Sequence, residues 1–147
     1  MAGFRFVIGT LVLLSAFAAL SCGSSHQLQN VTISPSAADA QQFPNGQVQF
    51  TAKGTFNGSS TPVTLTSKDI TWCYGGDANA ATPQAGICAG NIAQFASVDQ
   101  NGVAQCISGP QGFQGSVVIL AGVPSDMMMV DAGPQLKVFG SAVLTCP

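Results

Sequence analysis

Strict alternation of polar and apolar residues is the feature that most constrains how this chain folds. Every second residue of the segment Gln47–Lys53 is apolar, so Val48, Phe50 and Ala52 share one face of an extended strand. Glu is absent and only four residues are Lys or Arg, so the chain is poor in the residues that favour exposed helices. The pattern therefore predicts an all-β protein.

Turn-forming residues divide the rest of the chain into further short strands. Asp99-Gln-Asn-Gly102 is a strong hairpin signal, because Asn-Gly accepts the positive φ that a tight turn needs. Val117–Ala121 is apolar throughout, as expected of a central strand that is covered on both faces. Seven or eight short strands joined by turns indicate a β-sandwich. The other expected strands are Val31–Ser34, which ends at Pro35, then Val63–Leu65, Ile70–Tyr74, Gln94–Val98, Val103–Ile107 and Leu136–Leu144.

The first 21 residues have the composition of a signal peptide. Arg5 gives a positively charged start, and Phe6–Leu20 is an unbroken run of apolar or small residues. This run is short for a membrane-spanning helix, which needs about 20 residues, and a signal anchor is the alternative interpretation. We expect residues 1–21 to be cleaved, residues 22–30 to form a flexible tether and residues 31–147 to form the folded domain.

The end of this leader, Ala19-Leu20-Ser21-Cys22, resembles a bacterial lipobox. The resemblance implies that Cys22 receives diacylglycerol on its thiol, becomes the first residue of the mature chain and is acylated on its amino group. Several acyl chains anchor a protein stably, since each buried CH₂ contributes about 0.8 kcal/mol. Ala19 stands where the family more often has Leu, and an ordinary leader with a nearby cysteine is the alternative. His26, the only histidine, lies in the tether and is assigned no role.

Four cysteines remain besides Cys22, namely Cys73, Cys88, Cys106 and Cys146. An even number in an exported chain predicts two disulfides, for which three connectivities exist. The four form no CxxC pair and have no supporting histidine, so neither a zinc site nor a catalytic thiol is expected. The Gly- and Ala-rich segment between Cys73 and Cys88 is interpreted as an inserted loop.

Several motifs together resemble the group 2 type of bacterial immunoglobulin-like domain. They are VTISPS, GQVQFTAKGTF, DITWCYG, AQFASVDQNGVAQC and GSVVILAG, in this order between Gln29 and Cys146. The resemblance implies an immunoglobulin-like antiparallel sandwich, in which Cys106 and Cys146 come together at one pole and Cys73 and Cys88 clasp the insertion. A swapped pairing stays open, because both pairs would lie near the same pole. The chain departs from the family in this insertion and in a longer loop before the last strand.

Trp72 is the only tryptophan, and it shares a strand face with Ile70 and Tyr74. In the resembling fold this strand lies centrally, so we expect the indole to be buried between the sheets against Phe50 and Val117–Ala121. Truncating such a residue typically costs about 3–5 kcal/mol. The rival interpretation makes Trp72 an exposed platform for a sugar.

The scarcity of charge argues against two classes of function. After loss of Arg5 the chain keeps three Lys and six Asp, which leaves no cationic face for nucleic acid. Acid–base pairs and hydrolase triads have few residues to draw on, so we expect no enzyme, no metal and no cofactor. Asp99 and Asn101 are spaced like the start of a calcium loop, but the later ligands are missing.

The function that fits best is a non-catalytic binding or adhesion module at the cell envelope, anchored to a membrane by lipid on Cys22. Its partner would be a protein or a glycan, and the role rests on analogy with the fold. A purely structural envelope lipoprotein or spacer is the alternative. Met127, Met128 and Met129 form an apolar stretch that either contacts a partner or plugs one end of the sandwich.

Overall fold

A computed structural model describes residues 26–78, 86–89, 95–107, 114–125 and 134–147. Within them the chain forms ten strands and two single-turn 3₁₀ helices, η2 (Ala40–Gln42) and η3 (Pro44–Gly46). The all-β prediction is therefore confirmed. The strands are β1 (Leu28–Ser34), β2 (Ala37–Asp39), β3 (Gln47–Gln49), β4 (Thr51–Phe56), β5 (Val63–Thr64), β6 (Thr71–Asp77), β7 (Ala96–Val98), β8 (Val103–Cys106), β9 (Gly115–Pro124) and β10 (Leu136–Cys146).

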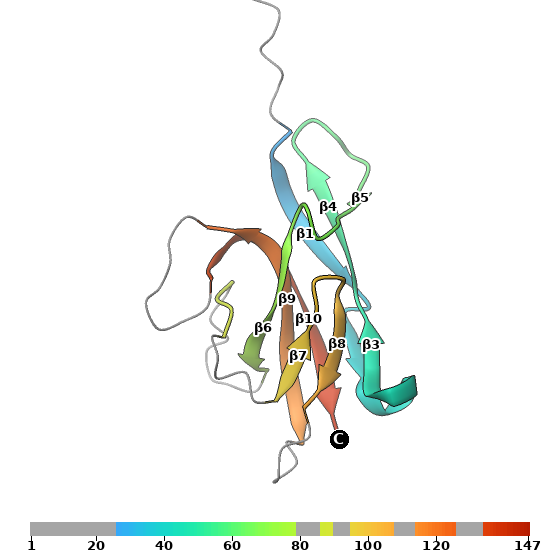
Figure 1. Ribbon diagram of the computed structural model, residues 1–147. Helices are drawn as coiled ribbons and strands as arrows, with labels where there is room; N and C mark the ends of the chain where they lie inside the picture. The colour runs from blue at the N-terminus through green and yellow to red at the C-terminus, as the bar shows by residue number, and fades with distance from the viewer. Residues whose placement is uncertain (1–25, 79–85, 90–94, 108–113, 126–133) are drawn as a thin grey trace, which may run out of the picture.

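These strands pack as a sandwich of two layers (Figure 1). The first layer contains β1–β4–β5 and β3–β8–β7, joined because β3 leads directly into β4, and the second has the order β2–β10–β9–β6. All neighbours are antiparallel except β2 and β10. In an immunoglobulin sandwich, strands A, B, E and D face strands C, F and G. Here β1, β3–β4, β8 and β7 take the first set of places and β6, β9 and β10 the second, so the predicted immunoglobulin-like sandwich is confirmed.

The structure has more strands than the expected seven or eight because two strands are divided between partners. The expected strand over 47–53 breaks at Phe50, where pairing with β8 ends and pairing of β4 with β1 and β5 begins. The first strand continues past Pro35, which has no N–H to extend the β1–β4 ladder. Beyond Pro35 the chain joins the other layer as β2, parallel to β10.

The domain also begins earlier than expected. Leu28 pairs with Phe56 at the start of β1, and its side chain packs against the main core. The prediction that residues 28–30 belong to a flexible tether is therefore wrong. The reason is that Leu28 supplies an apolar contact that a solvated tether would leave exposed to water.

The core lies between the layers and is built from the alternating faces of their strands. Val48, Phe50 and Ala52 are at most 1% exposed, as the alternation predicts. From the second layer, Val117 and Ile119 of β9 are 0% exposed and complete this core.

Residues of β9 and β10 that point away from the main core form a second cluster. Leu120 of β9 packs there with Cys88 and Leu136, so the central strand is covered on both faces, as predicted. A bulge between Leu136 and Val138 shifts the register of β10 against β9. Because a bulge reverses the alternation, Leu136 faces this second cluster while Val138 packs against the main core.

Candidate binding site

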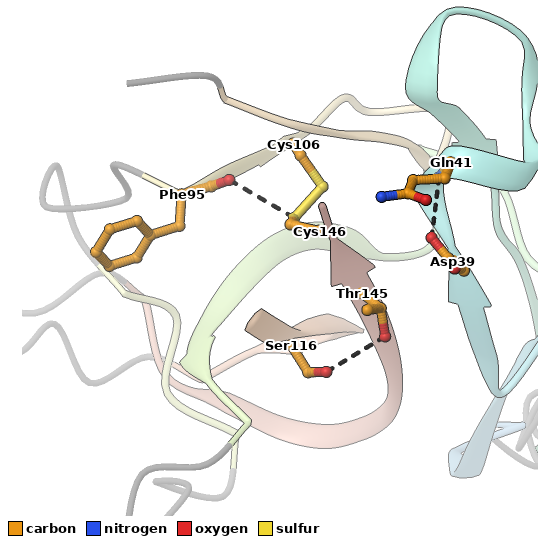
Figure 2. The surroundings of a disulfide bond; sticks show 7 residues. All are labelled: Asp39, Gln41, Phe95, Cys106, Ser116, Thr145 and Cys146. Atoms are coloured by element: carbon orange, nitrogen blue, oxygen red, sulfur yellow. Dashed lines mark hydrogen bonds between the residues drawn. A yellow bond between two sulfur atoms is a disulfide. The ribbon is translucent and has the colours of Figure 1, made fainter. Parts of the chain in front are cut away.

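Two disulfides link the same cysteine pairs that the resemblance implied. Cys106–Cys146 has an S–S distance of 1.99 Å and Cys73–Cys88 one of 2.04 Å. Figure 2 shows that Cys106, at the end of β8, reaches across to Cys146, at the end of β10. This bond therefore ties the two layers together at the end where the chain finishes. The sulfur of Cys146 also lies 4.0 Å from the carbonyl oxygen of Phe95.

The other disulfide holds the segment Gly86–Ala89 across the outer face of the second layer. The N–H of Ala89 donates to the carbonyl of Tyr74 in β6 at 2.7 Å, and the N–H of Leu136 donates to the carbonyl of Gly86 at 2.6 Å. The segment thus bridges β10 and β6, and Cys88 covers Leu120 between them. This end of the inserted loop serves as a covering for the central strand.

Trp72 differs from the expectation of a buried indole. Ile70 and Tyr74 are buried, at 5% and 7% exposed, but Trp72 is only partly buried. Its side chain does pack against the main core, so its inward direction agrees with the alternation. The expectation that this strand lies centrally is wrong: among the described strands β6 is at the edge of its sheet, so the indole is not enclosed by strands on both sides. A turn packs against the indole there, since a Cβ on Gly102 would lie 2.8 Å from its Cζ2 atom.

That turn, Asp99–Gly102, joins β7 and β8 as the sequence predicts. One carboxylate oxygen of Asp99 accepts hydrogen bonds from the N–H groups of Asn101 and Val103, both at 2.8 Å. Gly102 has φ +83° and donates its N–H to the carbonyl of Asp99 at 3.1 Å. Asn101 keeps a negative φ, so this is a type I turn closed by a left-handed glycine rather than a two-residue Asn-Gly turn.

A hollow of about 250 Å³ lies beside this turn, where one edge of the β3–β4 strand changes partner. The N–H of Phe50 donates to the carbonyl of Gly102 at 2.9 Å, at the limit of the β8 pairing. The carbonyl of Ala52 accepts from the N–H of Leu65, also at 2.9 Å, next to β5. Between these bonds none of the described strands adjoins this edge, and the hollow reaches through the gap to Trp72 of the second layer.

The hollow has an apolar floor and a neutral polar rim. Phe50, Ala52 and Leu65 are buried beneath it and Trp72 is partly buried. Among the described residues that line it, none carries a charge. Such a site offers hydrogen bonds and an aromatic surface without a fixed charge. The rim consists of exposed amide and hydroxyl side chains, those of Gln49, Thr51, Thr64, Thr66, Ser67, Gln100 and Asn101.

Asp69 orders one side of this rim. One of its carboxylate oxygens accepts hydrogen bonds from both the N–H and the hydroxyl of Thr66, each at 2.8 Å. The bond from the Thr66 N–H, the bond from its hydroxyl and the nearby charge of Lys68 hold the pKa of Asp69 below its ordinary value. The carboxylate is therefore ionised at neutral pH, where it holds the Thr66–Asp69 turn in place.

Two other hollows in the described part of the chain have a different character. A groove of about 430 Å³ on the outer face of the second layer is lined mainly by apolar and small residues, including Val118, Leu120 and Phe139. A hollow of about 320 Å³ lies between η2, η3 and Cys106. Neither combines a tryptophan with a ring of exposed amides and hydroxyls, so the Trp72 hollow is the best candidate site.

The remaining sequence-predicted sites are not brought to this hollow. Cys22 and Met127–Met129 lie outside the described residues. His26 is exposed just before β1. In the part of the chain that the structure describes, no helix has the length and hydrophobicity needed to cross a membrane.

Sequence reasoning singled out Trp72 but missed its polar neighbours. Within residues 57–68 the sequence predicts only the short strand Val63–Leu65, and their run of Thr and Ser is the available signal for the polar rim. No protein-family model matches the chain, and no curated protein or solved structure matches it either. The candidate site is therefore defined by its own geometry.

Proposed function

We propose that this protein is an exported, lipid-anchored, immunoglobulin-like module that binds a partner at the cell envelope without catalysing a reaction. The observation that carries the proposal is the presence of two disulfides in one small sandwich. Disulfides persist in oxidising compartments and are rare in the cytosol. A leader over residues 1–21 would deliver the chain to such a compartment, and lipid on Cys22 would keep it at a membrane.

The Trp72 hollow favours a binding role over a purely structural one. A spacer domain needs a stable core and does not need exposed polar side chains gathered around a partly buried aromatic ring. Here those groups meet at the gap between β8 and β5, which offers a defined place for a ligand. The resemblance to group 2 bacterial immunoglobulin-like domains supports the same role by analogy.

The anchor is tested by expressing the full chain in a bacterium and following labelled fatty acid and membrane fractionation. We expect the wild-type chain to incorporate label and sediment with membranes, and Cys22→Ser to lose both or to accumulate unprocessed. Ser24→Ala, two residues further on, is the matched control and should behave like the wild type. The alternative is a signal anchor. In that case the wild type and Cys22→Ser would both stay on the membrane, keep their leader and incorporate no fatty acid.

The binding role is tested by recovering the lipidated protein from its native envelope and identifying what is retained with it. A binding module should retain a specific component, and the Trp72 hollow variants described below should lose it. Recovery of the protein with no component that depends on this hollow would favour the structural spacer.

A further inference from the structure

The chemistry of the Trp72 hollow restricts the ligands that it suits. Its described lining has no Lys, Arg, Asp or Glu, so a phosphate, a nucleic acid or a strongly charged peptide would find no compensating charge there. Its volume of about 250 Å³ is also below the roughly 300–1,000 Å³ of pockets for drug-sized ligands. The hollow therefore suits one small, neutral ring.

The indole of Trp72 retains a free hydrogen-bond donor. None of the described residues accepts a hydrogen bond from its N–H, and no buried side-chain nitrogen or oxygen among them lacks a partner. The N–H is therefore reachable by solvent, and so by the polar atoms of a ligand. The side chains of Gln100 and Asn101, exposed on the neighbouring turn, add amide donors and acceptors that no described residue engages.

The walls of the hollow are fixed before any ligand arrives. The amide nitrogen of Gln49 donates to the carbonyls of Phe50 and Asn101, each at 2.8 Å, and so locks the turn to the strand. Asp69 holds Thr66 on the other side. A preorganised site loses less conformational entropy on binding, which favours affinity for a small ligand.

We propose that this hollow binds one ring of a neutral saccharide, an inference that rests on the proposed role as a non-catalytic binding module. A sugar ring has apolar C–H groups that pack on an indole, and hydroxyls that pair with amides, hydroxyls and the indole N–H. It carries no charge, in agreement with the lining. A protein partner would need a contact of about 800 Å² on each side, for which a single-ring hollow gives no specific reason.

The test is titration of the detergent-solubilised full chain with neutral trisaccharides built from glucose, xylose or N-acetylglucosamine. Trp72 is the only tryptophan, so its emission reports on the hollow directly. We expect at least one of these sugars to shift the emission in a saturable way, because a ring seated on the indole displaces water from it. Calorimetry then gives the affinity of each variant.

Three variants separate sugar binding from folding. Trp72→Phe keeps an aromatic ring but loses area and the N–H donor, and should weaken binding about tenfold or more. Gln100→Ala removes an exposed side chain without an internal hydrogen bond, and should weaken binding severalfold while leaving unfolding unchanged. Gln42→Ala, another exposed glutamine that lies in η2 and does not line the hollow, is the matched control and should bind like the wild type.

Absence of any emission shift across the three sugars would overturn the proposal. So would a sugar that binds Gln100→Ala and Trp72→Phe as tightly as the wild type, because that sugar would occupy another site. A cross-linking group placed at position 100 of this chain tests for a protein partner. Capture of a protein there that the sugars do not prevent would show a peptide ligand instead. None of these results depends on Cys22, so failure of the saccharide proposal is distinguishable from failure of the lipid anchor.

Discussion

The two ends of β8 are held in different ways. At Cys106 a disulfide joins β8 covalently to β10 of the opposite layer. At the other end, the Asp99–Gly102 turn rests on Trp72, and the layers meet there through packing. The first end is closed by the bond between the partly buried Cys106 and the buried Cys146, and the second opens into the hollow.

This difference shows how a small sandwich can stay folded although its core is not fully covered at one end. A disulfide stabilises mainly by restricting the unfolded chain, so its contribution does not require complete packing elsewhere. The open end can then leave an aromatic residue partly exposed, with exposed amides and hydroxyls around it. We infer that the covalent end supplies stability and the open end supplies binding.

The largest expected effect comes from removing the covalent closure. The double variant Cys106→Ala, Cys146→Ala removes a disulfide whose cysteines are 40 residues apart. In the chain-entropy model this loss lowers the free energy of unfolding by about 4 kcal/mol. The double variant Cys73→Ala, Cys88→Ala removes a disulfide whose cysteines are 15 residues apart, and should lower the free energy of unfolding by about 3 kcal/mol. Denaturant unfolding of the full chain measures both. A larger loss from the Cys73 and Cys88 pair would contradict the assignment of stability to the Cys106 end.

The next effect concerns the glycine of the open end. Gly102 and Gly58 both have positive φ, +83° and +78°, but only Gly102 is packed: an added Cβ would lie 2.5 Å from the carbonyl oxygen of Phe50. Gly58 has nothing within 4 Å of that position. We expect Gly58→Ala to cost about 1 kcal/mol from backbone strain and Gly102→Ala about 3 kcal/mol, since steric overlap is added.

Chemical denaturation of the two alanine variants measures this difference. Gly102→Ala should also alter the emission of Trp72, because the new methyl group presses on the indole, while Gly58→Ala should leave it unchanged. Equal losses of stability would mean that the turn does not rest firmly on Trp72.

The smallest expected effect is a pH dependence confined to the open end. The folded-state pKa of Asp69 is lowered, so its carboxylate stabilises the fold above the unfolded-state pKa. That contribution is lost as the pH falls below about 4 and through the folded-state value. The wild type should therefore lose slightly more stability on acidification than Asp69→Asn, as followed by thermal unfolding between neutral pH and pH 3. Identical acid profiles would show that the Thr66–Asp69 turn does not depend on this charge.

Much of the fold was predictable because its signals are local. The alternation over Gln47–Lys53 placed Val48, Phe50 and Ala52 correctly, and the apolar run of Val117–Ala121 correctly predicted the central strand. The hairpin at Asp99–Gly102 followed from its turn residues. The candidate site was only partly predictable: Trp72 stood out as the single tryptophan, while Thr64 and Ser67 resembled ordinary connector residues.

The sequence by itself determined which residues face inward wherever a strand has no bulge, as over Gln47–Lys53, since side chains alternate along an extended strand. Only the tertiary structure decided which strand lies at each edge, because hydrogen-bond partners come from distant segments of the chain. That decision divides the strand at Phe50 between β8 and β5 and leaves a gap between them. Trp72 stays only partly buried at this gap because β6 lies at the edge of its sheet among the described strands, where a turn packs against the indole.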